Sequence, residues 1–246
     1  MEQVMVKNLY CLEETIAAPL LEQAVYPWEV LPKIGAFILE LGETLPEEEY
    51  EKRGDDIWIA KTAQIAPTAC IYGPAIIGKE AEIRHGAFIR GKVIVGEGAV
   101  VGNSTELKNA ILFNRVQVPH YNYVGDSILG YKAHMGAGSI ASNVKADKRP
   151  VTVATPEGRI ETGLKKFGEM LGDEVEVGRG SVLNPGTVVG RQSNIYPLSL
   201  VRGYVPEKSI YKKQGEVVQK EEGQITMAGS MLGVIDGKGN GCNDRK

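Results

Sequence analysis

One residue pattern recurs every six positions from Ile59 to Lys108 and limits what this chain can fold into. An aliphatic residue opens each unit, and a small or β-branched residue stands four positions later. The aliphatic residues are Ile59, Ile65, Ile71, Ile77, Ile83, Ile89, Val95, Val101 and Leu107. Neither the 3.6-residue period of a helix nor the 2-residue period of a strand explains this recurrence, whereas hexapeptide repeats are typical of a β-helix. The sequence therefore predicts an all-β solenoid in which about 18 residues form one three-sided coil, and successive coils stack about 4.8 Å apart.

The repeat divides the chain into three parts. Residues 1–52 precede it, and the apolar spacing of Trp28, Leu31 and Ile34 predicts a helical segment, opened by Pro27, that caps the open first coil; a helix pair that binds a partner is the alternative. The β-helix itself is expected over residues 53–206, ending at Pro206, and a loosely ordered C-terminal extension over residues 207–246.

Two features interrupt the β-helix. The aliphatic step shortens to five at Leu107–Leu112 and again at Val124–Leu129, and such slips force bulges of the kind found beside active sites. Residues 143–170 lose the repeat, are charged and contain several turn-forming proline and glycine residues, so they are expected to form an inserted hairpin.

Composition excludes several classes of function. The net charge of -3 offers no basic excess for nucleic acid or an anionic membrane, and no apolar run is long enough to cross a bilayer. The three cysteines form no CxxC pair, which argues against a disulfide framework or a cysteine-bound metal and fits a reducing cytoplasm. We expect a cytoplasmic protein that binds neither nucleic acid nor membrane.

Charged residues in the repeat indicate an anion site. Arg90 and Lys108 are 18 positions apart, one coil, so their side chains should stack. Two cations about 5 Å apart repel unless an anion lies near them, and a phosphate suits that position. Glu106 leaves open the alternative of a plain surface ion pair.

His120 lies in the coil that the two register slips bracket, in the segment VPHYNYVGDS. An imidazole with its ordinary pKa of about 6.5 suits a general base, although a lone histidine is more often structural. His85 has no comparable surroundings and is interpreted as structural.

From Arg90 through GNSTELKNA, PHYNYVGDS and HMGAGSIASNVK to Ile210, the sequence resembles the acetyltransferase half of the bifunctional enzymes that make UDP-N-acetylglucosamine. The resemblance implies a left-handed parallel β-helix, a homotrimer, acetyl-CoA as co-substrate, glucosamine 1-phosphate or a similar amino sugar phosphate as acceptor, and no metal. Only about 50 residues precede the repeat, too few for a nucleotide-binding domain, so uridyltransferase activity is not expected.

Carried over residue by residue, the resemblance makes His120 the base that deprotonates the sugar amine. It makes Arg90, Lys108, Tyr123 and Asn143 substrate-binding residues. His134 stands where the family has a sugar-binding asparagine, which puts the acceptor in doubt.

For acetyl-CoA, the resemblance assigns the Gly136 and Ala137 N–H groups to the thioester oxygen, and it places Arg179 and Pro197 along the pantetheine groove. Two other functions remain open: a non-catalytic β-helix that binds a sugar nucleotide or a partner protein, and a zinc enzyme like the γ-class carbonic anhydrases. The second would need all three histidines, His85, His120 and His134, as ligands.

Overall fold

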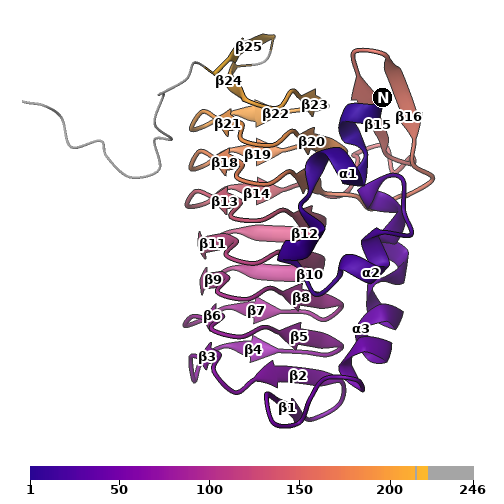
Figure 1. The fold of residues 1–246 in the computed structure, drawn as a ribbon. Helices are drawn as coiled ribbons and strands as arrows, with labels where there is room; N and C mark the ends of the chain where they lie inside the picture. The colour runs from indigo at the N-terminus through magenta and orange to yellow at the C-terminus, as the bar shows by residue number, and fades with distance from the viewer. Residues whose placement is uncertain (214, 221–246) are drawn as a thin grey trace, which may run out of the picture.

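The chain forms a three-sided parallel β-helix in the computed structural model, which describes residues 1–213 and 215–220. The coils stack in chain order along one axis (Figure 1). The predicted fold class, a left-handed β-helix of hexapeptide repeats, is confirmed. The inward positions hold the repeat residues, so Ile77, Ile83 and Ile89 are 0%, 1% and 0% exposed.

Each side of the β-helix is a stack of short strands. We call the three sides faces 1, 2 and 3, in the order in which the chain passes through them. Face 1 comprises β2 (Ile57–Ala60), β5 (Ala75–Ile77), β8 (Val93–Val95), the second halves of β10 (Glu106–Leu112) and β12 (Tyr123–Leu129), β17 (Glu169–Leu171), β20 (Thr187–Val189) and β23 (Tyr204–Val205). Face 2 comprises β3 (Gln64–Ile65), β6 (Glu82–Ile83), β9 (Val100–Asn103), β11 (Gln117–His120), β13 (His134–Met135), β18 (Glu176–Val177), β21 (Asn194–Ile195), β24 (Ser209–Lys213) and β25 (Glu216–Gln219). Face 3 comprises β4 (Cys70–Ile71), β7 (Phe88–Ile89), the first halves of β10 and β12, β14 (Ile140–Ala141), β19 (Val182–Leu183) and β22 (Leu200–Val201).

The two register slips join face 3 to face 1. Each five-residue step removes one residue from the corner, and β10 and β12 therefore run around it as continuous seven-residue strands. The ladder pairs Lys108 with Gly125 and Ala110 with Ser127, and it skips Asn109 and Asp126. Both skipped residues have positive φ, 49° and 51°, which matches the irregularity that the sequence predicts.

The N-terminal segment is helical only in short pieces. These are η1 (Glu2–Val4), α1 (Val6–Leu9), η2 (Leu12–Glu14), α2 (Ala18–Leu21), η3 (Pro27–Lys33) and α3 (Ile34–Gly42). The predicted apolar helix face is present, with Trp28, Leu31, Ile34 and Ile38 buried, and Pro27 opens η3 as expected.

The predicted position of that segment, over the open first coil, is wrong. The segment runs along face 1, where α3 packs on β5, β8 and β10, and η3 packs on β12 (Figure 1). The first coil is instead flanked by β1 (Tyr50–Arg53), which pairs antiparallel with β2.

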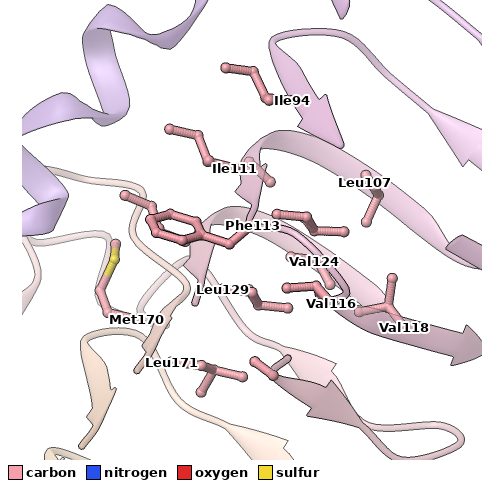
Figure 2. Packing of buried hydrophobic residues seen from close by; sticks show 14 of the residues in the cluster. Ile94, Leu107, Ile111, Phe113, Val116, Val118, Val124, Leu129, Met170 and Leu171 are labelled. Carbon is pink, nitrogen blue, oxygen red and sulfur yellow. The ribbon is translucent and has the colours of Figure 1, made fainter. Parts of the chain in front are cut away.

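A second apolar column explains this placement. Face 1 points large side chains outward as well as inward, and the outward ones are 0% exposed because the N-terminal segment covers them. The outward residues are Ile76, Ile94, Ile111, Ile128, Met170 and Val188. Figure 2 shows Ile94, Ile111 and Met170 on the side of the N-terminal helices, and Leu107, Val124 and Leu171 on the inner side.

The insertion contains the hairpin that the sequence predicts. β15 (Thr152–Thr155) and β16 (Gly158–Glu161) pair antiparallel beside the upper coils (Figure 1). The β-helix continues past Pro206, against prediction, because β24 pairs in parallel with β21 and extends the stack to Lys213. Most of the predicted C-terminal extension, residues 214 and 221–246, lies outside the described residues.

Candidate active site

The edge between faces 2 and 3 brings together five of the predicted site residues. The carbonyl groups of His120, Ala137 and Arg179 each accept a hydrogen bond from the turn of the next coil, at 2.9 Å from Gly138, Gly180 and Leu198. Gly136 directly precedes Ala137 in the chain, and Pro197 directly precedes Leu198. We call this column of residues the His120 edge.

His120 ends β11 with its side chain exposed, and its ring makes no hydrogen bond or ion pair within residues 1–213 and 215–220. Its backbone N–H donates to Asn122 Oδ1 at 3.1 Å. The buried Asn122 amide donates to Gly136 O at 2.9 Å and to Ser139 O at 3.1 Å. Asn122 therefore fixes the turn that presents His120 against the MGAG turn of the next coil.

The Gly136 N–H belongs to the ladder, because it donates to Val177 O at 2.7 Å. It is therefore not available for the oxyanion role predicted for it. The neighbouring Ala137 is exposed, and among the described residues its N–H donates to no backbone carbonyl. Of the two predicted N–H donors, only that of Ala137 is free to meet a ligand.

A buried carboxylate organises the opposite edge of face 3. Asp126 is 4% exposed and accepts hydrogen bonds from Lys108 Nζ at 3.1 Å, Asn109 Nδ2 at 2.9 Å and Asn143 Nδ2 at 2.6 Å. Asn143 Nδ2 also donates to the Tyr123 hydroxyl at 3.2 Å. We call these five residues the Asp126 corner; three of them, Lys108, Tyr123 and Asn143, are predicted site residues.

Tyr123 connects the two edges. It lies on face 3, three residues after His120 and three before Asp126. Partial burial, followed by the charges of Asp126 and Glu106, raises the pKa of its phenol. The hydroxyl is therefore protonated at neutral pH and can donate a hydrogen bond to a ligand lying on face 3.

Arg90 and Lys108 lie in adjacent coils, as their spacing predicts, with the Arg90 N–H donating to Leu107 O at 2.8 Å. Each cation already has a carboxylate partner. Arg90 Nη1 lies 2.6 Å from Glu106 Oε1, and this hydrogen bond raises the Arg90 pKa, while Lys108 lies on Asp126. These carboxylates already offset the repulsion between the two cations, so no further anion is needed. Arg90 forms the surface ion pair with Glu106 that the sequence left open as an alternative. Phosphate binding by Arg90 and Lys108 stays a prediction.

His134 takes part in neither the His120 edge nor the Asp126 corner. It is level with Gln117 on face 2, and its Nδ1 lies 2.7 Å from Glu176 Oε2. His85 Nδ1 lies 2.9 Å from Thr68 Oγ1. Within the described part of the chain, no three His, Cys, Asp or Glu side chains converge as metal ligands would, so the zinc-enzyme alternative gains no support.

Residues 71–191 match the family model described as the GMPPB C-terminal domain. The bifunctional protein GlmU of Methanococcus vannielii is 36% identical over 121 residues, which are 49% of this chain and 29% of the relative. The bifunctional sugar-1-phosphate nucleotidylyltransferase/acetyltransferase of Sulfurisphaera tokodaii is 31% identical over 112 residues, 46% of this chain and 28% of the relative. The chain thus spans under a third of the length of these relatives.

A solved structure of PerB from Caulobacter crescentus, in complex with CoA and GDP-perosamine, is 15% identical with a TM-score of 0.34, covering 63% of this chain and 52% of that one. The resemblance to the acetyltransferase half of GlmU, predicted from the sequence, is confirmed by the sequence relatives. No helix in the described residues is long and apolar enough to cross a membrane.

Sequence reasoning missed Asp126 and Asn122, the two residues that fix these edges. Asp126 is the residue that the second register slip removes from the ladder, so the slip marked its position without indicating its role. Asn122 carried no signal beyond lying two residues after His120.

Proposed function

We propose that this chain is an acetyl-CoA-dependent N-acetyltransferase that acts on an amino sugar phosphate, with His120 as the general base. The observation that carries the proposal is the similarity, over about half of the chain, to bifunctional enzymes of which one is named as a sugar-1-phosphate nucleotidylyltransferase/acetyltransferase. The exposed imidazole on the His120 edge, which makes no hydrogen bond or ion pair to the part of the chain that the structure describes, supports it.

In the proposed reaction, the amine nitrogen of the sugar attacks the thioester carbonyl carbon and His120 takes a proton from that nitrogen. The C–N bond forms, the C–S bond breaks, and the thiolate of CoA leaves and is protonated. The Ala137 N–H faces the oxygen on which negative charge develops, replacing the pair of N–H groups predicted from the sequence. A positioned base of this kind contributes about 10² to 10⁴ in rate.

Acetyl-CoA is placed along the His120 edge, past Arg179 and Pro197, because both side chains are exposed there above Ala137. The acceptor is placed on face 3 between His120 and the Asp126 corner, where the Tyr123 hydroxyl and the Arg90 guanidinium face solvent in part. In this arrangement the amine points toward His120 and the phosphate toward Arg90 and Lys108.

A homotrimer in the cytoplasm is part of the proposal. Large apolar side chains remain exposed beside the proposed substrate site, with Ile140, Leu198 and Leu200 at 40%, 83% and 55% exposure. A surface of this kind is typical of a site covered by another copy or by a ligand. Analytical ultracentrifugation tests the trimer, and a monomer at micromolar concentration would contradict it.

The proposed activity is tested by incubating the full chain with acetyl-CoA and a panel of amino sugar phosphates, and recording free CoA with a thiol reagent. Release with at least one acceptor, together with a mass increase of one acetyl group on that acceptor, is expected. No release with any acceptor would contradict the proposal.

The alternative is a β-helix that binds a sugar nucleotide without catalysis. The Glu106–Arg90 and Asp126–Lys108 pairs count against the amino sugar phosphate as acceptor, because the predicted phosphate ligands are already occupied by carboxylates. Tight binding of a sugar nucleotide, with no CoA released in the assay above, would establish this alternative.

A further inference from the structure

A cleft of about 580 Å³ lies under the β15–β16 hairpin, outside the site assigned above. Its floor is the outer edge of face 3, with Ser142, Asn184 and Arg202 in successive coils. The hairpin residues Thr152, Ala154 and Arg159 form one wall, and the turn at residues 144–147 forms another. We call this space the hairpin cleft.

The hairpin is held in place by its packing on the β-helix, so the cleft is a fixed feature of the fold. Val151 and Val153 are 0% exposed. Gly186 lies directly under the hairpin at φ 83°, and a Cβ there would lie 2.7 Å from Thr152 O and 2.8 Å from Val151 Cγ1. Only glycine permits this close approach.

The cleft is positively charged although the chain as a whole is negative. Three cations, Lys145, Arg159 and Arg202, line it against one carboxylate, Asp147, which lies 3.3 Å from Lys145 Nζ. Among the described residues, Arg159 and Arg202 make no ion pair. They differ in this from Arg90 and Lys108, whose charges are offset by Glu106 and Asp126.

Two guanidinium groups without carboxylate partners, lining one cleft, are suited to phosphate oxygens, which accept paired hydrogen bonds from arginine. The volume lies within the roughly 300 to 1,000 Å³ usual for pockets that hold cofactors and other small molecules, and it exceeds what a lone phosphate needs. We propose that the hairpin cleft binds a phosphate-bearing ligand of about nucleotide size, held through its phosphates by Arg159 and Arg202.

The cleft adjoins the candidate active site. Ser142, on its floor, directly precedes Asn143 of the Asp126 corner. Under the proposed function, on which this assignment rests, the phosphates belong either to the coenzyme or to a nucleotide carried by the acceptor. The binding itself does not depend on acetyl transfer by His120.

The test is isothermal titration of the full chain with four probes: CoA, dephospho-CoA, UDP and inorganic pyrophosphate. Arg159→Ala and Arg202→Ala each remove charge-assisted hydrogen bonds to the phosphates, so affinity for the bound probe should fall about tenfold or more. Arg115→Ala is the matched control, because Arg115 is exposed at a corner of the β-helix that does not line the cleft.

Weaker binding of CoA, with a smaller effect on dephospho-CoA and none on UDP, supports the proposal and assigns the cleft to the coenzyme. Weakening confined to UDP supports it and assigns the cleft to the acceptor, and weakened pyrophosphate binding supports it for either source. The proposal fails if none of the probes binds the wild type, or if both cleft variants bind every probe as tightly as Arg115→Ala does. Because these are binding measurements, neither failure depends on whether the acetyltransferase assay succeeds.

Discussion

Glu169 provides a sharp test of how the interior of the β-helix is packed. It lies on β17 at an inward position where other coils hold Ala75, Ala110 or Ser127, and it is 0% exposed. Neither carboxyl oxygen has a hydrogen-bond partner among the described residues. Desolvation by burial raises its pKa from the ordinary 4.5 to about 8, so the carboxyl group is protonated in the folded protein at neutral pH.

This shift makes stability depend on pH with a defined sign. Between pH 4.5 and about 8 the folded state holds a proton that the unfolded state has lost, so the free energy of unfolding falls as the pH rises. The slope approaches about 1.4 kcal/mol per pH unit, which gives a loss of roughly 2 to 3 kcal/mol between pH 5.5 and 7.5. Glu169→Gln keeps the shape of the protonated acid and removes the titration.

The assay is urea unfolding of the wild type and Glu169→Gln at pH 5.5, 6.5 and 7.5, at one protein concentration. The fluorescence of Trp28 and Trp58, which are 2% and 4% exposed, reports unfolding. Subtracting the two pH profiles cancels the contributions of other titrating groups such as Asp173. Glu169→Gln should gain stability relative to the wild type as the pH rises; parallel profiles would show that Glu169 is not buried as a neutral acid.

Three further substitutions test other parts of the structure. Ile111→Ala removes an outward side chain that the N-terminal segment buries on face 1 and should cost about 2 to 5 kcal/mol in urea unfolding; a cost below about 1 kcal/mol would mean that the segment does not cover it. Asp126→Asn leaves the partly buried Lys108 ammonium without its carboxylate and should lower the free energy of unfolding by about 1 to 3 kcal/mol in the same assay. A variant as stable as the wild type would show that Asp126 does not hold this corner together. Glu106→Gln should leave stability nearly unchanged because its ion pair with Arg90 is exposed, yet it should tighten binding of glucosamine 1-phosphate measured by calorimetry, and unchanged affinity would argue that Arg90 does not bind the phosphate.

The β-helix could be predicted because its core depends on a local repeat. Each inward aliphatic residue recurs at a fixed spacing, so the pattern alone determines which side chains meet. The same spacing brought Arg90 next to Lys108 and showed that the coil containing His120 is irregular. The outward apolar residues of face 1, which include Ile94 and Ile111, also recur once per coil in the sequence. This second recurrence predicts that another segment covers face 1, which is where the N-terminal segment lies.

The candidate site could be predicted only in part, because it depends on contacts between segments with no common period. Asn143 reaches Asp126 from beyond a turn, and the hairpin cleft exists only because the insertion folds back onto Gly186. The pairing of Arg90 with Glu106 rather than with a ligand is a choice between side-chain conformations that the sequence does not specify.

His120 is proposed as the base for acetyl transfer, and the kcat of His120→Ala with acetyl-CoA and the best acceptor from the panel tests that role. The exposed side chain makes no hydrogen bond within the described residues, so the variant should keep the wild-type circular dichroism spectrum and oligomeric state. We expect kcat to fall about 10²- to 10⁴-fold. A kcat within about twofold of the wild type would contradict the assignment of His120.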